Sequence, residues 1–507
     1  MTIMKKMKKL MTAVLLLMSI GVMLVSCSKS TDEAAFIPKD ALFVCDLNAG
    51  SVMEKGDLND LKQLKFVATL LNYMDSSNAV VGKLYSDALS NPASCGVDIN
   101  GNVVYFCAQD EGEMVQVVMA RLTDVEAFKT IVNRLRDEGD VNCEEGRVKD
   151  LDYVLFEDEV MALFDENRVL FVIADGVEAM QTYGSKYFNL KKKKSMLNNK
   201  HFAEYWKNRS DVNCFLSYDN LFDMIGDSEV ETLFSEEQIK ELSQMAYCFY
   251  LTFDEGSIVL QCNVLGQSKE MQQMADQKFN KDLMPMLPEQ TLAATTFAFN
   301  ADVAADYIAK MKQMKGYMDL PVGVGEYTVR DIIKAFGGSM AVNFYGFKNE
   351  STTPLLVVAA DVKNTELVEA LLSETGMVKN GDIYTMDDIK LYYKDGIVVY
   401  ATDEAVLDQI VAGGYDNAVQ RIADNAAKGD YVFIDLNMNH YPQELYKRFD
   451  YDPTTMAVIA YISQVFDYVD MQGANSSTTV TLHLNDASVN SLKLFVQMFD
   501  QAVQPSL

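Results

Sequence analysis

The side chains best suited to acid–base, nucleophilic or metal chemistry are scarce in this chain. It contains three histidines, His201, His440 and His483, and none has another histidine or a cysteine at the spacing of a metal site. The serine nearest to a hydrolase motif is Ser339, but its Gly-Gly-Ser-Met context lacks the closing glycine and leads into a predicted strand. The segment Gly323-Val324-Gly325 lacks the third glycine of a dinucleotide loop. The sequence therefore predicts no catalytic residue, no metal ligand and no cofactor.

Carboxylates are the one abundant reactive group, with 73 Asp and Glu residues. They crowd two regions, one from Asp219 to Glu229 and one from Asp150 to Glu159, and neither region has the spacing or the glycine of an EF-hand. We therefore expect solvated acidic loops there rather than calcium sites. A glycosidase needs only two carboxylates about 5–10 Å apart. A hydrolase that acts on polysaccharide or peptidoglycan consequently remains an alternative.

A different chemistry is predicted at the N-terminus. Four lysines between Lys5 and Lys9 precede an apolar run from Leu10 to Val25, which is too short to span a bilayer comfortably and is typical of a signal peptide. The segment Leu24-Val25-Ser26-Cys27 resembles the lipobox of bacterial lipoproteins. That resemblance implies removal of residues 1–26 and attachment of lipid to Cys27, so the predicted partner of this end of the chain is a membrane.

The residues after Cys27 indicate where the anchor would reside. Ser28 stands where an Asp would be expected in a protein held back from the outer membrane, and the pair Asp32-Glu33 resembles the export tag of surface lipoproteins in the Bacteroidota. We therefore expect an outer-membrane, lipid-anchored protein, either surface-exposed or periplasm-facing. Residues 27–36 form the predicted lipidated tether.

The charge of the chain excludes some partners. Without residues 1–26 the net charge is −33, from 40 basic and 73 acidic residues. Such an excess of negative charge argues against binding to nucleic acid and against electrostatic docking of the whole chain on anionic lipid. The one cationic island runs from Lys191 to Lys194 and is followed by Phe202, Tyr205 and Trp206. A glycan-binding site and a lysine-rich loop before an amphipathic helix both fit this pattern, and the loop is the commoner arrangement.

Cysteines are confined to the first half of the expected mature chain, since none follows Cys262. Seven cysteines other than Cys27 cannot all pair within the chain. Several lie in apolar runs such as Val104-Tyr105-Phe106-Cys107, where a thiol behaves as a small buried hydrophobe. A disulfide or two is the other interpretation in an oxidising envelope, and no spacing resembles a redox or zinc motif.

The elements that would carry these residues occur twice in the same order. Each copy begins with a proline-containing lead-in before an apolar strand, Ile37-Pro38-Lys39-Asp40-Ala41 in the first and Leu287-Pro288-Glu289-Gln290-Thr291 in the second. Two strands and a helix follow, the first helix opening at a capping-box pattern of Thr123 and Glu126. A hairpin then turns near Asp165 in one copy and at Asp395-Gly396 in the other.

This recurrence predicts an α+β protein of two tandem, related modules, each a largely antiparallel sheet with helices packed on one face. The modules are expected at residues 37–266 and 287–507, joined by a connecting helix at 267–286. In the second copy, a helical stretch is expected at 442–449. A duplicated module whose loops have diverged would account for the common order.

The anchored start, the Ile-Pro-Lys-Asp-Ala motif and the long two-part body resemble a family of uncharacterised Bacteroidota lipoproteins built on a domain of unknown function. The resemblance implies location and fold but supplies no functional residue. We expect a non-enzymatic binding or interaction module for a glycan or an envelope protein. A carboxylate-pair hydrolase and a periplasmic carrier of lipid or protein are the alternatives, which an acid-lined cleft or an apolar cavity would favour.

Overall fold

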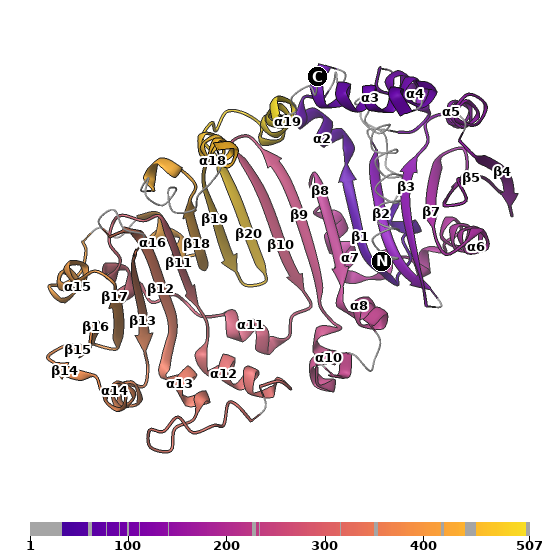
Figure 1. Cartoon of the computed structure of the whole chain (residues 1–507). Coiled ribbons are helices and arrows are strands. Elements are labelled where there is room, and N and C mark those ends of the chain that lie inside the picture. Colours follow the sequence, from indigo (N-terminus) through magenta and orange to yellow (C-terminus); the bar gives the residue numbers. More distant parts are fainter. Residues whose placement is uncertain are drawn as a thin grey trace. The chain divides into compact units, whose positions relative to one another are not determined.

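The computed structural model describes residues 33–502, apart from residues 59–62, 78, 91, 99–100, 111, 140, 226–229, 233, 315, 349–352, 417–419 and 442–452. The predicted signal peptide, Cys27 and the helix expected at 442–449 lie outside the described residues. The chain divides into two compact units, each assembled from separated segments (Figure 1). Unit 1 comprises Met1–Gly226, Met245–Ile258 and Ser488–Leu507, and unit 2 comprises Asp227–Gln244 and Val259–Ala487.

The sheet of unit 1 is antiparallel, in the order β4-β5-β6-β7-β3-β2-β1-β8-β9. Its strands are β1 (Ala41–Asn48), β2 (Asn102–Asp110), β3 (Glu113–Arg121), β4 (Cys143–Val148), β5 (Leu151–Phe156), β6 (Val160–Phe164), β7 (Arg168–Ile173), β8 (Val212–Ser217) and β9 (Ala246–Asp254). Valine, isoleucine and aromatic residues dominate these runs, and such side chains suit a pleated, half-buried surface.

Helices and short 3-10 turns connect these strands. They are η1 (Glu33–Phe36), α2 (Ala49–Gly56), α3 (Lys65–Ser77), α4 (Ala79–Ser90), η3 (Pro92–Cys95), α5 (Val125–Asp137), α6 (Val177–Phe188), η4 (Lys192–Lys194), η5 (Met196–Asn198), α7 (Lys200–Lys207), α8 (Tyr218–Ile225) and the C-terminal α19 (Ser491–Ala502). The N-cap of α5 is Asp124, whose carboxylate accepts from two backbone N–H groups. The predicted box of Thr123 and Glu126 was therefore one residue too early.

Helices cover both faces of the unit 1 sheet. Phe128 of α5 packs against Phe171, with ring centroids 6.5 Å apart. The side chain of Val172, the next residue on β7, lies beside Gly184 of α6 instead. Because successive side chains of a strand point to opposite faces, α5 and α6 lie on opposite sides of the sheet. The antiparallel α+β class is confirmed, whereas the helices of this unit are not restricted to one face.

Unit 2 has the strand order β14-β15-β16-β17-β13-β12-β11-β18-β19-β20-β10. These strands are β10 (Ser257–Leu265), β11 (Ala293–Ala298), β12 (Phe336–Phe347), β13 (Pro354–Val362), β14 (Val378–Asn380), β15 (Ile383–Met386), β16 (Ile389–Lys394), β17 (Ile397–Ala401), β18 (Asp430–Asp435), β19 (Phe466–Ala474) and β20 (Ser477–Leu484). The first two residues of β10 belong to unit 1.

The helices and 3-10 turns of unit 2 are α10 (Glu236–Leu242), α11 (Lys269–Ala275), η6 (Lys281–Met286), α12 (Ala301–Lys310), α13 (Val329–Ala335), α14 (Thr365–Glu374), α15 (Glu404–Val411), α16 (Gln420–Ala426), η7 (Met438–His440) and α18 (Pro453–Val465). Where one connecting helix was expected at 267–286, the chain forms α11 and then η6. The core gathers apolar residues of β11, β13 and β17 under α15, including Val357, Val399, Leu407 and Ile410.

The strand order of unit 1 recurs in unit 2, since β1 to β9 correspond one by one to β11 to β19. The N-caps that follow the first strand of each series also match: the Asn48 side chain accepts from the Ser51 N–H and that of Asn300 from the Val303 N–H. The turn after Asp165 joins β6 to β7, and the turn at Asp395 joins β16 to β17. A duplication of one module would produce this correspondence, and it remains a prediction about the origin of the chain.

Candidate functional site

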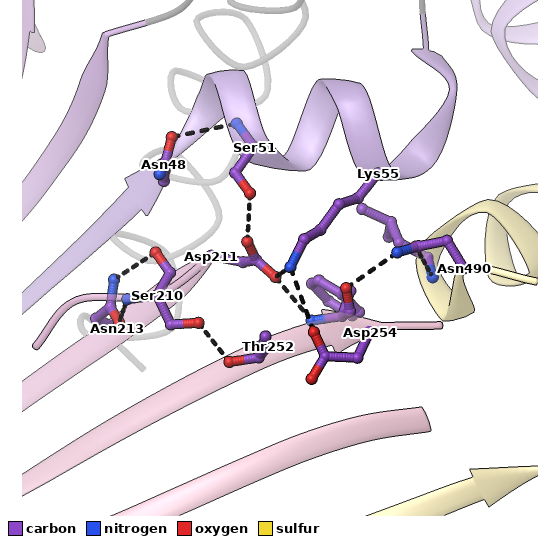
Figure 2. A network of polar contacts seen from close by, with 11 residues as sticks. Asn48, Ser51, Lys55, Ser210, Asp211, Asn213, Thr252, Asp254 and Asn490 are labelled. Carbon is purple, nitrogen blue, oxygen red and sulfur yellow. Dashed lines mark hydrogen bonds and ion pairs between the residues drawn. The ribbon is translucent and has the colours of Figure 1, made fainter. Parts of the chain in front are cut away.

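A buried carboxylate, Asp211, holds together separated segments of unit 1 (Figure 2). It directly precedes β8 and is 2 % exposed. Its oxygens accept from Ser51 Oγ at 2.5 Å, from Lys55 Nζ at 2.8 Å and from the Phe253 backbone N–H at 2.7 Å. Ser51 and Lys55 are four residues apart on α2, so both face the same way. The carboxylate therefore joins α2, β8 and β9.

The surroundings of Asp211 are suited to positioning rather than to catalysis. Asn490, just before α19, donates its side-chain amide to the Phe253 carbonyl at 3.0 Å and brings the C-terminal helix to the same place. Lys55 also lies 3.7 Å from Asp254, a half-exposed carboxylate. The three groups described above that donate to the Asp211 carboxylate are a hydroxyl, an ammonium and a backbone N–H, and none of them is a histidine. This network does not form a nucleophile–base pair of the kind that activates a serine.

A second buried carboxylate, Asp46, lies on β1 and is also 2 % exposed. It accepts from Tyr205 Oη at 2.8 Å and from Asn213 Nδ2 at 3.1 Å, and Arg209 Nη1 lies 3.6 Å away. Burial raises the pKa of the Asp46 carboxyl, and Arg209, Tyr205 and Asn213 offset part of that rise. The Arg209 guanidinium stacks 3.6 Å over the Trp206 ring. The aromatic residues after the lysine run thus build this polar core contact.

The neighbouring strands carry a disulfide between Cys45 of β1 and Cys214 of β8. The two residues are directly opposed in the antiparallel pair, with a Cα–Cα distance of 4.2 Å. Cys107, Cys143 and Cys262 are thiols, and burial raises the pKa of both Cys107 and Cys143 to about 11. The sequence left open whether these cysteines are buried thiols or disulfides, and the chain contains both.

Unit 2 contains a cavity of about 310 Å³ between α10, α11 and α12. Most of the residues that line it carry polar or charged groups, and the lining consists of Ser235, Glu237, Gln238, Lys240, Glu241, Gln244, Gly266, Gln267, Ser268, Glu270, Tyr307 and Lys310. Ser235 is the N-cap of α10 and Ser268 that of α11. The local signals that start these two helices therefore also place hydroxyl groups at the cavity. The carrier alternative predicts an apolar cavity, whereas most side chains that line this one are polar or charged.

Charged groups of both signs converge in this cavity. Lys310 of α12 donates to both carboxylate oxygens of Glu270, at 2.8 and 2.7 Å, and the pKa of this lysine is raised by that contact. Tyr307 Oη donates to Glu241 Oε2 at 3.4 Å, and burial, with the nearby Glu241 charge, raises the pKa of Tyr307 to about 12. The carboxyls whose pKa burial raises, Asp46 and Asp430, are not among the lining residues. The lining therefore offers both hydrogen-bond donors and hydrogen-bond acceptors to a ligand.

The three histidines and the serine considered from the sequence are dispersed through the fold. His440 Nδ1 lies 2.6 Å from Asp435 on an exposed turn, and His483 lies 3.3 Å from Asp470. His201 is in the first turn of α7. The Ser339 side chain is buried on β12 and accepts from the Asn280 N–H at 2.9 Å. None of these residues lines the cavity.

Contrary to the expectation from the sequence, the acidic clusters are not confined to loops. Residues 150–159 comprise strand β5 and the turns on either side of it, and Asp219 and Asp223 lie in α8, while Asp227 and Glu229 lie outside the described residues. Within the part of the chain that the structure describes, no group of three or more His, Cys, Asp or Glu side chains could hold a metal ion. In the same part of the chain, no helix is both long enough and apolar enough to cross a membrane.

Comparison with known proteins assigns the chain to a protein family. The family model described as "Domain of unknown function (DUF4836)" matches residues 34–492. The chain belongs to the DUF4836 family. The expected membership of a family built on a domain of unknown function is confirmed, and no curated protein matches this DUF4836 chain.

Solved structures similar to this DUF4836 protein include two crystal forms of TP0453. Crystal form III is 10 % identical in sequence, with 50 % of this chain and 84 % of the other covered, at a TM-score of 0.27. Crystal form IV is also 10 % identical and covers 46 % of this chain and 81 % of the other, at a TM-score of 0.26. Similarity at this level supplies no function to the chain.

The sequence did not reveal the cavity, because its lining comes from segments up to 75 residues apart, from Ser235 to Lys310. One signal was available for Asp46. It is the only charged residue in the apolar run from Leu42 to Leu47. Because it is two residues after Val44 and four after Leu42, its side chain lies on the same buried face of the strand as theirs. A charged residue on the core face of a strand needs partners, so this position indicates a buried polar contact.

Proposed function

We propose that this DUF4836 protein is a lipid-anchored, non-enzymatic binding protein of the cell envelope, and that the cavity of unit 2 is its ligand site. The observation that supports binding is the lining of that cavity, where carboxylates, ammonium groups, amides and hydroxyls converge without a nucleophile–base pair. Its volume of about 310 Å³ lies at the lower end of the range of small-molecule sites. The proposed ligand is accordingly small and polar.

The ligand class that suits this lining is a glycan of one or two sugar rings. Sugar hydroxyls both donate and accept, so they can bond to the Glu241 carboxylate, the Lys310 ammonium and the Gln267 amide in turn. The Tyr307 ring supplies the one aromatic surface in the lining. Lys310 and Glu270, which already pair with one another, are both partly exposed, so either group can exchange its partner for a neutral ligand at little cost in free energy.

The envelope location is proposed from two independent features. The lipobox at Leu24 to Cys27 implies export and acylation, and the Cys45–Cys214 disulfide is of the kind that persists in oxidising compartments. An outer-membrane anchor at Cys27 would place the ligand site among envelope glycans and proteins. We propose the outer membrane, with the mature chain surface-exposed or periplasm-facing.

The binding proposal is tested by isothermal titration of the purified full-length protein with defined probes: the disaccharide of N-acetylglucosamine, cellobiose and maltose. We expect saturable one-site binding of at least one probe, and a loss of affinity of roughly tenfold or more in Glu241→Gln, since each charged hydrogen bond contributes about 1.5–3 kcal/mol. Glu366→Gln, on the exposed surface of α14, is the matched control and should bind as the wild type does. If no probe gives saturable binding, the glycan assignment is wrong.

A further inference from the structure

The segment that enters unit 1 from the anchor side is fixed next to the lysine run. Pro38 forms an isolated antiparallel bridge with Ser195, the residue that follows Lys194. The Lys39 N–H donates to the Lys194 carbonyl at 3.0 Å, and the Met196 N–H donates to the Ile37 carbonyl at 2.9 Å. Two parts of the chain more than 150 residues apart are therefore joined through their backbones.

This junction is firmly packed. Ile37, Ser195 and Met196 each have an exposed fraction of 0 %. Arg168 stacks 3.7 Å over the ring of Phe36, at the end of η1, and also lies 4.1 Å over the ring of Phe188. The described chain thus begins in a 3-10 turn held against the body of unit 1, and that turn lies beside the lysines.

The lysines themselves face solvent. Lys191 to Lys194 are all exposed, as are Lys39 and Lys200 on either side of the junction. The turn that carries the run is held from behind, since Ser195 Oγ donates to the Lys192 carbonyl at 2.8 Å and Asn198 Nδ2 donates to the same oxygen. Six ammonium groups therefore project from one small region of a protein that is otherwise strongly acidic.

Acidic residues near this patch are fewer than the lysines. Asp40 follows Lys39 and is exposed, and Asp219 is an exposed neighbour of Asn220, whose side chain donates to the Lys39 and Ala41 carbonyls. Glu204, one turn after Lys200 on α7, is also exposed, and Glu33 in η1 is buried. These four carboxylates are fewer than the six lysines. The local charge of this surface is thus opposite in sign to that of the whole chain.

The length of the tether places this patch close to the predicted anchor. Five residues lie between Cys27 and Glu33, the first described residue, and the six residue steps between them span at most about 22 Å in a fully extended chain. A lipid at Cys27 would therefore keep the lysine patch within a short distance of the bilayer surface. At that distance the acyl chains supply membrane affinity, and the lysines determine which side of unit 1 faces the headgroups.

We infer that Lys39, Lys191 to Lys194 and Lys200 form a membrane-facing surface that contacts the phosphate groups of anionic phospholipids in the bilayer that holds the anchor. This inference rests on the proposed lipid anchor but not on the proposed glycan site. The net charge of the chain opposes electrostatic docking of the chain as a whole. The patch therefore orients unit 1 without providing the affinity, which comes from the lipid.

The test is amine-reactive labelling of the full-length lipidated protein on vesicles of phosphatidylcholine, with or without phosphatidylglycerol, read by mass spectrometry. On phosphatidylglycerol vesicles we expect labelling of Lys191 to Lys194 to slow by about threefold or more, and to recover in 1 M salt, where the Debye length falls to about 3 Å. Lys149, in the turn between β4 and β5, is exposed and should react at the same rate on both vesicles.

A variant with glutamine at positions 191 to 194 tests the patch itself. It should remain on the vesicles, while the protection of Lys39 and Lys200 by phosphatidylglycerol is lost. The matched control changes four scattered exposed lysines of unit 1 to glutamine, Lys65, Lys83, Lys149 and Lys207, and should keep that protection. Equal labelling of the wild type on both vesicles would overturn the inference. Failure to stay on phosphatidylcholine vesicles would instead overturn the anchor on which it rests.

Discussion

Loss of the Asp211 side chain should destabilise unit 1. Replacing it by alanine leaves Lys55 without its buried partner and removes the acceptor of the Phe253 N–H and the Ser51 hydroxyl, so we expect the free energy of unfolding to fall by about 3–5 kcal/mol. Asp254→Ala removes a half-exposed carboxylate 3.7 Å from the same lysine and should cost about 1 kcal/mol or less. Urea denaturation measures both, and equal losses would contradict the role of Asp211.

At the residue scale, sequence reasoning missed the contacts that organise the polar core. Asp211 stands beside a strand, and nothing in its neighbours distinguishes it from an ordinary loop aspartate. Its three partners lie on α2 and β9, 40 or more residues away along the chain. Only the pairing of distant strands brings these groups together, and local pattern carries no information on it.

At the scale of elements, the disulfide between β1 and β8 should stabilise unit 1 by restricting the unfolded chain. It closes a loop of 169 residues, for which loop entropy gives about 5 kcal/mol as an upper value. We expect Cys45→Ala with Cys214→Ala to lower the free energy of unfolding by about 2–5 kcal/mol. Cys262→Ala, which removes a partly exposed thiol, is the control and should cost much less. Similar losses in the two proteins would indicate that the bridge contributes little.

The elements themselves were largely predictable where periodicity was strong. The two strands and the helix expected after the first apolar strand occur as β2, β3 and α5. The Asp395-Gly396 turn also occurs, with φ of 51° and 76° at its two central residues. The face that each helix covers was less predictable. Strand β7 is a continuous apolar run that is buried on both sides, because α5 and α6 each cover one of them. Such a run does not show which helix lies on which side.

At the scale of the whole molecule, Cys27→Ser should release the protein from membranes. This expectation rests on the proposed lipid anchor, whose acyl chains would supply the affinity, since the net negative charge of the chain opposes electrostatic binding of the whole chain to anionic lipid. Membrane sedimentation and metabolic labelling with palmitate measure the outcome, and Cys262→Ser should behave as the wild type does. A Cys27→Ser protein that still sediments with membranes and incorporates palmitate would show that the lipoprotein prediction is wrong.

The predicted modules and the compact units have different boundaries in the sequence. The modules follow the repeated order of strands and end the second copy at the C-terminus, whereas α19 packs into unit 1, where Lys493 Nζ reaches Asp57 at 2.7 Å and the Phe66 N–H donates to Asp500 at 3.1 Å. These partners are more than 430 residues apart in sequence. No local pattern could have linked them.

The packing of α19 into unit 1 also sets the order in which the protein can mature. Phe499 lies edge-on to Phe66 of α3, with ring centroids 5.1 Å apart, so the first unit obtains its last helix only when the final residues of the chain have been synthesised. The last segment of unit 1 begins at Ser488, which is 230 residues after Ile258, where its preceding segment ends. Unit 1 therefore cannot complete its packing until nearly all of unit 2 has been made.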